Sequence, residues 1–219
     1  MRSRPLPLAA LALLFLLAPP LAGRAAAAAA EFRLDPLRST LLLRVWKEGA
    51  LSAFAHDHVI RASKFTGTVR FDPGHPQASA IEVTAETAGL VADEPTYRHR
   101  FDMPPVDEQS RNEIEHTMLS SKQLDAAAFP TITFKSTRVL EQGAIQMLVT
   151  GALTIHGQTR EVTFPADVAI VQGLFRGRAT FRFHQSDFGI TPYSFGNAVR
   201  NQDEVEMHLE LIGAPAPAR

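Results

Sequence analysis

Apolar and polar residues alternate along much of this chain, as they do in strands that bury only one face. Between residues 129 and 165, three alternating segments follow one another, with polar breaks at 141–143 and 156–158. Successive side chains of a strand point to opposite faces, so this spacing predicts an antiparallel meander with one apolar face. Gly157 in the second break supplies the backbone freedom that a tight hairpin requires. Because this meander carries no catalytic motif, we expect it to be part of a wall that encloses an interior rather than a reaction centre.

The same alternation recurs on both sides of the meander and brings the expected strands to at least eight. The additional strands are expected at residues 40–47, 65–71, 81–86, 175–183 and 204–211. One domain made of this many half-buried strands packs either as a closed barrel or as a two-sheet sandwich. The regular meander favours an antiparallel β-barrel of about eight strands, whose interior is filled by side chains or widened for one elongated ligand.

Two segments interrupt the strands. Residues 108–119 contain no Gly or Pro and place Ile114, Met118 and Leu119 at helical spacing, which predicts one short helix capping an end of the barrel. Residues 92–105 before it are expected to form a long polar loop. Because long loops often act as lids or rims, we expect this loop at the mouth of the barrel.

The first 30 residues have the parts of an export signal. Arg2 and Arg4 form a basic start, residues 8–18 are apolar, and the alanine tract 25–30 follows. The apolar run is shorter than the roughly 20 residues that a membrane-spanning helix needs. We therefore expect residues 1–30 to be a signal peptide cleaved within Ala25 to Ala30, and the mature protein to be periplasmic without a membrane span. An uncleaved amino-terminal anchor is the alternative.

Composition narrows the class of protein further. The chain has no cysteine, so an exported form depends on a packed core rather than on disulfides. Without residues 1–30 the 22 basic residues fall by three, which leaves 19 against 23 acidic residues and a net charge of −4. This balance gives no reason to expect nucleic acid as a partner. The remaining length suits one domain, expected at 31–212, with 213–219 as a disordered tail.

Five motifs follow one another along nearly the whole of this domain. They are Asp35-Pro36 with Ser39, Phe65-Thr66-Gly67, Leu124-Asp125 with residues 129–136, residues 151–160, and residues 186–190. In this order and spacing they resemble the YceI-like family. The resemblance implies a lipocalin-like β-barrel, usually exported to the periplasm, whose interior holds a long isoprenoid chain such as a polyprenyl phosphate or a quinone tail. It implies no established enzymatic reaction. Residues 49–60 depart from the commoner pattern, in which a shorter link is expected.

A polyisoprenoid offers apolar surface and one polar head, so its site would be a long apolar bore with a few polar groups at one end. Inward-facing apolar residues of the expected strands are the candidates for this bore. They are Val45, Phe65, Val69, Ile81, Val83, Phe134, Val149, Leu153, Phe164, Phe181 and Phe183. The alternative is that the same side chains simply fill the core of a barrel that holds no ligand.

Charged and titratable residues near the expected mouth are candidates for binding a head group. Arg98 and Arg100 in the loop are suited to a phosphate through charge-assisted hydrogen bonds. His56 and His58 lie two residues apart, so on an extended backbone both would point to one face. There they would contact a head group.

The same two histidines support a rival function, a metal-dependent hydrolase or isomerase. His56 and His58 would hold zinc, with His99 or His116 as the third ligand and a water in the open position. No recognised zinc or hydrolase motif occurs, and therefore we expect no metal, no cofactor and no enzymatic activity. The sequence thus favours a periplasmic protein that binds a polyisoprenoid or similar amphiphilic lipid as a carrier or sequestering protein. A ligand-free structural or stress-response protein is the third possibility.

Overall fold

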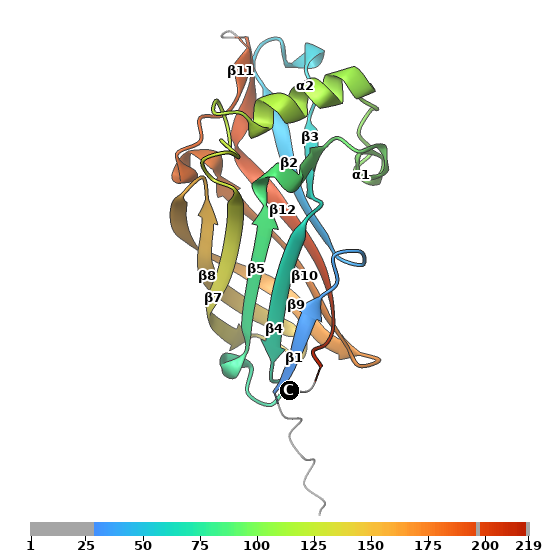
Figure 1. Cartoon of the computed structure of the whole chain (residues 1–219), viewed down its shortest axis with the longest axis vertical. Coiled ribbons are helices and arrows are strands. Elements are labelled where there is room, and N and C mark those ends of the chain that lie inside the picture. Colours follow the sequence, from blue (N-terminus) through green and yellow to red (C-terminus); the bar gives the residue numbers. More distant parts are fainter. Residues whose placement is uncertain (1–28, 196–197, 218–219) are drawn as a thin grey trace, which may run out of the picture.

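The computed structural model of the chain describes residues 29–195 and 198–217. The expected signal peptide, apart from its last two residues, lies outside this part. No helix among the described residues has the length and apolar character needed to cross a membrane. Figure 1 shows an elongated barrel with α2 across one end and strand β1 at the other.

Twelve strands form one antiparallel sheet in the described part of the chain. The strands are β1 (Ala30–Leu34), β2 (Thr40–Glu48), β3 (His58–Ala62), β4 (Phe65–Phe71), β5 (Ala80–Glu86), β6 (Leu90–Ala92), β7 (Thr131–Glu141), β8 (Gln146–Ile155), β9 (Gln158–Val171), β10 (Leu174–His184), β11 (Ser194–Phe195) and β12 (Val199–Pro215). The helices are α1 (Pro95–Arg100) and α2 (Glu108–Leu119), with 3-10 turns η1 (Ser52–Phe54), η2 (Pro76–Ala78), η3 (Thr87–Gly89) and η4 (Gln185–Phe188).

Short strands join end to end, so that the wall has eight long strands. β1 and β2 make up one long strand, β3 and β4 a second, and β5 and β6 a third. The first long strand lies beside the second, because β1 pairs with β4 and β2 pairs with β3. The second lies beside the third, because β4 pairs with β5 and β3 pairs with β6. β7, β8, β9, β10 and β12 follow as neighbours, and β12 returns to both β1 and β2. The closed eight-stranded antiparallel barrel that the sequence predicted is therefore confirmed.

The predicted hairpin turn after β8 is present. His156 and Gly157 have φ values of 49° and 71°, and Ile155 pairs with Gln158 across them. Positive φ at both central residues is the two-residue turn that fits the twist of the flanking strands. A Cβ on residue 157 would lie 2.6 Å from the ring of Phe129, so glycine is required here for space as well as for conformation.

The prediction of a disordered tail at 213–219 is wrong for residues 213–215. Gly213, Ala214 and Pro215 pair with β1, and the backbone N–H of Ala216 donates to the carbonyl of Glu31 over 2.8 Å. Gly, Ala and Pro have weak strand propensity, but pairing with a strand at the other end of the chain overrides it. Strand β1 was not predicted either, since its five residues are too few for a clear alternation.

The helix at 108–119 is confirmed, whereas the loop at 92–105 is not. Asp107 caps α2 by accepting the backbone N–H of Ser110 at 2.9 Å, and this hydrogen bond, followed by the one from the Ser110 hydroxyl, lowers the pKa of the Asp107 carboxyl. The expected loop contains α1, which begins with Pro95 at its first position. Its six residues are too few for a helical periodicity in the sequence.

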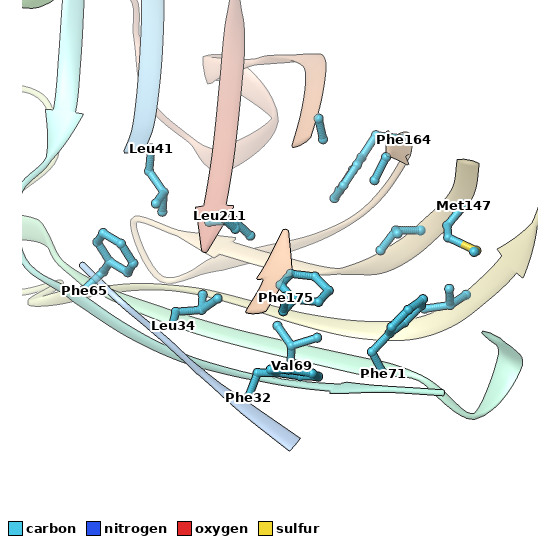
Figure 2. Close-up of a cluster of buried hydrophobic side chains, with 14 of the residues drawn as sticks. Phe32, Leu34, Leu41, Phe65, Val69, Phe71, Met147, Phe164, Phe175 and Leu211 are labelled. Carbon is cyan, nitrogen blue, oxygen red and sulfur yellow. The ribbon is translucent and has the colours of Figure 1, made fainter. Parts of the chain in front are cut away.

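The end of the barrel farthest from α2 is filled by aromatic and aliphatic side chains (Figure 2). Phe175 of β10 lies with its ring centroid 5.8 Å from Phe32 of β1 and 6.1 Å from Phe71 of β4. Val69 and Leu211 are buried in the same cluster. Residues of β1, β4 and β10 thus meet in one apolar plug.

We expect removal of residues 213–219 to destabilise the barrel, because β12 would lose its pairing with β1. Each backbone hydrogen bond contributes about 0.5–1.5 kcal/mol, so the free energy of unfolding should fall by about 1–4 kcal/mol in urea titrations. Removal of residues 217–219 alone keeps these pairs and should change nothing. Equal midpoints for both truncations would show that the strand end does not close the barrel.

Candidate functional site

A cavity of about 830 Å³ lies inside the barrel at the α2 end. Its volume falls within the roughly 300–1,000 Å³ of typical small-molecule sites. Most of its lining is aliphatic and comes from β2, β3, β8, β12 and α2. The aliphatic lining residues from these elements are Leu41, Leu43, Val45, Ile60, Ala62, Ile114, Met118, Leu153, Ile155, Val199 and Met207.

Helix α2 covers the cavity with one of its faces. Ser110, Glu113, Ile114, Thr117 and Met118 line the cavity, and their spacing of three and four residues places them along one side of the helix. Ile114 and Met118 give this side an apolar stripe, with polar groups beside it. The predicted capping helix therefore forms part of the site.

A second space of about 140 Å³ continues toward the plugged end. Leu41, Leu153 and Met207 border both spaces. The second space is narrow because phenylalanine rings occupy it, with Phe164 and Phe181 stacked at a centroid distance of 4.3 Å. The interior is thus wide and aliphatic near α2 and narrow and aromatic below.

The residues predicted to line the bore are divided between these two spaces. Val45, Leu153, Phe183, His56 and His58 line the large cavity. Phe65 is buried in the core and lines neither space. The others border the narrow space, together with Leu153; they are Val69, Ile81, Val83, Phe134, Val149, Phe164 and Phe181. Their role as ligand contacts stays a prediction.

Several lining residues were missed although the sequence carries a signal for them. Leu43 has the same strand parity as Val45, and Ile60 has the same parity as His58. Met207 was assigned to a strand but not to the bore. Parity shows which side chains face inward, but it does not show how far along the barrel axis each one lies.

The main polar feature at the cavity wall is a buried group of three side chains. Asp93, which follows β6 and is fully buried, accepts from the Nδ1 of His58 at 2.7 Å through Oδ2. Its Oδ1 accepts the backbone N–H of Val59 at 3.1 Å and Nη1 of Arg98 at 2.5 Å. Burial by itself would raise the pKa of Asp93, but hydrogen bonds from His58, Val59 and Arg98 hold it below its usual value. Asp93 is therefore a carboxylate at neutral pH.

The positions of the two arginines correct the expectation that they meet a phosphate head group. Arg98 is only 2% exposed, and besides Asp93 it donates to the carbonyls of Asp57 and Pro104. Arg100 pairs with Glu210 on the outside of the barrel, over 2.9 Å. Neither lines the cavity. The two arginine side chains point to different places because both residues lie on helix α1, and residues two apart on a helix point in different directions.

The histidines do not form the zinc site of the rival hypothesis. His58 uses Nδ1 for Asp93, while His56 is exposed in the segment before β3. His99 and His116 lie on exposed faces of α1 and α2. Across the described ranges, no three His, Cys, Asp or Glu side chains gather in the way that a metal ion requires. The structure gives no support to the zinc hypothesis.

Asp93 should be far more important for stability than its neighbour Glu94. Replacing Asp93 by Ala leaves the buried Arg98 charge without a carboxylate, which costs about 3–5 kcal/mol. Glu94→Ala is the matched control, because Glu94 pairs with Arg61 at a site where both side chains are about a quarter exposed (27% and 26%). That change should cost at most about 1 kcal/mol in urea titrations. Similar losses for the two variants would contradict the buried pair.

The chain is similar in sequence to UPF0312 proteins of other bacteria. It is 29% identical to a UPF0312 protein of Vibrio cholerae, over 69% of this chain and 72% of that one. It is 31% identical to a UPF0312 protein of Pseudomonas putida, over 64% of this chain and 62% of that one.

Solved structures share the fold. The crystal structure of BcnA from Burkholderia cenocepacia matches with a TM-score of 0.63 at 20% identity, covering 82% of this chain and 98% of BcnA. A YceI protein of Campylobacter jejuni matches with a TM-score of 0.53 at 16% identity, over 73% and 85% of the two chains. The family described as the YceI-like domain matches residues 32–211. The chain therefore belongs to the YceI-like family.

Proposed function

We propose that this protein binds one polyisoprenoid or similar amphiphilic lipid inside the barrel and acts as a periplasmic carrier or sequestering protein. The observation that carries the proposal is the cavity of about 830 Å³, bordered by one face of α2 and lined mostly by aliphatic side chains. The YceI-like family and its barrel fold are consistent with a hydrophobic ligand. The periplasmic location rests on the export-signal pattern of residues 1–30.

The energetics of burial favour a ligand of this kind. Transfer of a methylene group from water to an apolar site is worth about 0.8 kcal/mol, so one five-carbon unit contributes about 3–4 kcal/mol before ordering costs are subtracted. Two or three buried units would suffice for tight binding. The branched chain suits walls made of Leu, Ile, Val and Met, which are irregular and adaptable.

The distribution of polar groups sets the orientation of the ligand. The narrow space has an almost wholly apolar lining, so the tail end would point toward it, past Leu153 and Met207. His58, Gln185 and Asn201 line the large cavity, as do Ser110 and other polar residues of α2. The head group would therefore lie in the large cavity near α2, where these side chains can hydrogen-bond to it.

Substitution of Ile60 by Trp tests the proposal, because the indole would occupy space in the large cavity. The probe is geranylgeraniol, titrated into delipidated protein. The dissociation constant should rise about tenfold or more, since excluding two methylene groups already costs about 1.6 kcal/mol.

Leu140→Trp is the matched control. Leu140 is 41% exposed and borders neither interior space, so this variant should bind as the wild type does. The proposal fails if the delipidated wild type takes up no isoprenoid, or if the two tryptophan variants bind equally well.

A further inference from the structure

We propose that His58 determines which lipid head group the cavity accepts, and that it selects an uncharged head group carrying a hydroxyl over a phosphate or an ether. This inference rests on the proposed function, because it concerns the head group of a lipid in the same cavity. The structure supports it through the charge of the lining and through the hydrogen-bonding state of the His58 ring.

The lining gives an anionic head group no fixed positive charge. Among the described residues that line the large cavity there is no lysine or arginine, and Glu113 contributes a carboxylate. Arg98 lies behind the wall, where Asp93 neutralises it and the carbonyls of Pro104 and Asp57 accept hydrogen bonds from Nε and Nη1. A phosphate would thus lose hydration without gaining an ion pair, which is unfavourable.

Asp93 fixes the tautomer of the His58 ring whenever the ring holds a single proton. A carboxylate only accepts hydrogen bonds, and Oδ2 of Asp93 lies 2.7 Å from Nδ1 of His58. Nδ1 must therefore carry a proton. The second oxygen of the carboxylate is already occupied by Val59 and Arg98, so the carboxylate cannot turn without breaking those bonds.

The other ring nitrogen of His58 then faces the ligand as an acceptor. The ring lines the cavity, its side chain is 16% exposed, and no described residue forms a hydrogen bond with Nε2. In the Nδ1–H tautomer, Nε2 carries a lone pair and no proton. A hydroxyl group of a ligand can donate to it, whereas an ether or a hydrocarbon end cannot.

The backbone holds this acceptor in a defined place. His58 is the first residue of β3 and pairs directly with Val45 of β2, another residue of the cavity wall. Both its backbone and its ring are fixed, so little entropy is lost when a ligand hydrogen-bonds to it. Discrimination by one well-placed neutral hydrogen bond amounts to about tenfold in affinity.

The test compares three ligands with the same tail: geranylgeraniol, its methyl ether and its monophosphate. The dissociation constants are measured with delipidated wild type, His58→Leu and His75→Leu. The wild type should bind the alcohol about tenfold more tightly than the ether and at least about tenfold more tightly than the monophosphate. In His58→Leu the affinity for the alcohol should fall to that for the ether, with the ether affinity unchanged.

His75→Leu is the matched control. His75 also lies near an aspartate, with Nδ1 3.5 Å from Asp72, but it is 63% exposed in the turn between β4 and β5, at the end of the barrel opposite α2 (Figure 1). This variant should keep the full preference for the alcohol.

A second measurement needs no substitution. Long-range proton–nitrogen correlation spectra of the wild type should show His58 as the Nδ1–H tautomer, with an Nε2 signal that moves on addition of the alcohol and stays in place with the ether. An Nε2–H tautomer would overturn the inference. So would equal binding of the three ligands, or a preference that survives in His58→Leu, and in both cases the proposed function would still stand. If the wild type binds none of the three, both fail.

Discussion

The closed ladder of backbone hydrogen bonds around the barrel is the constraint on which the rest of the structure depends. β12 pairs with β10 on one side and with both β1 and β2 on the other, so it joins the two ends of the sheet. Because the ladder carries the shape of the wall, the interior does not have to be filled to hold the strands apart. A cavity of about 830 Å³ in a single domain is a consequence of this closure.

The two ends of the barrel interior differ in how tightly they are packed. Phenylalanines close one end, and their packing supplies much of the apolar burial that stabilises the domain. The other end is lined by aliphatic side chains and covered by α2, which is capped by Asp107 and held to β6 by the hydrogen bond from the Ala92 backbone N–H to Glu115. Stability and ligand space are thus assigned to opposite ends of one barrel.

The sequence predicted those features that depend on local patterns. Strict alternation identified β4 with its observed bounds, Phe65–Phe71, and the absence of Gly and Pro identified α2 with its observed bounds, Glu108–Leu119. Features held by distant contacts were missed. β1 and the end of β12 are strands because they pair with each other, and α1 is held by the ion pair between Arg98 and Asp93.

The candidate site shows the same limit. Inward parity found Val45 and Phe183, and the spacing of His56 and His58 singled out His58. Nothing local connects His58 with Asp93, which is 35 residues away. An acidic residue directly after the apolar end of β6 was the single available hint. The arginines chosen for a phosphate were assigned as loop charges, and the structure turns one into the core and the other onto the outer surface.

The central claim is that the barrel is a container for one lipid molecule. Native mass spectrometry of the protein isolated from bacterial cells tests it most directly. We expect a mass that exceeds that of the polypeptide by one lipid, and the excess should disappear after extraction with organic solvent and return when an isoprenoid alcohol is added. A protein that carries no lipid on isolation and gains none on addition would contradict the account.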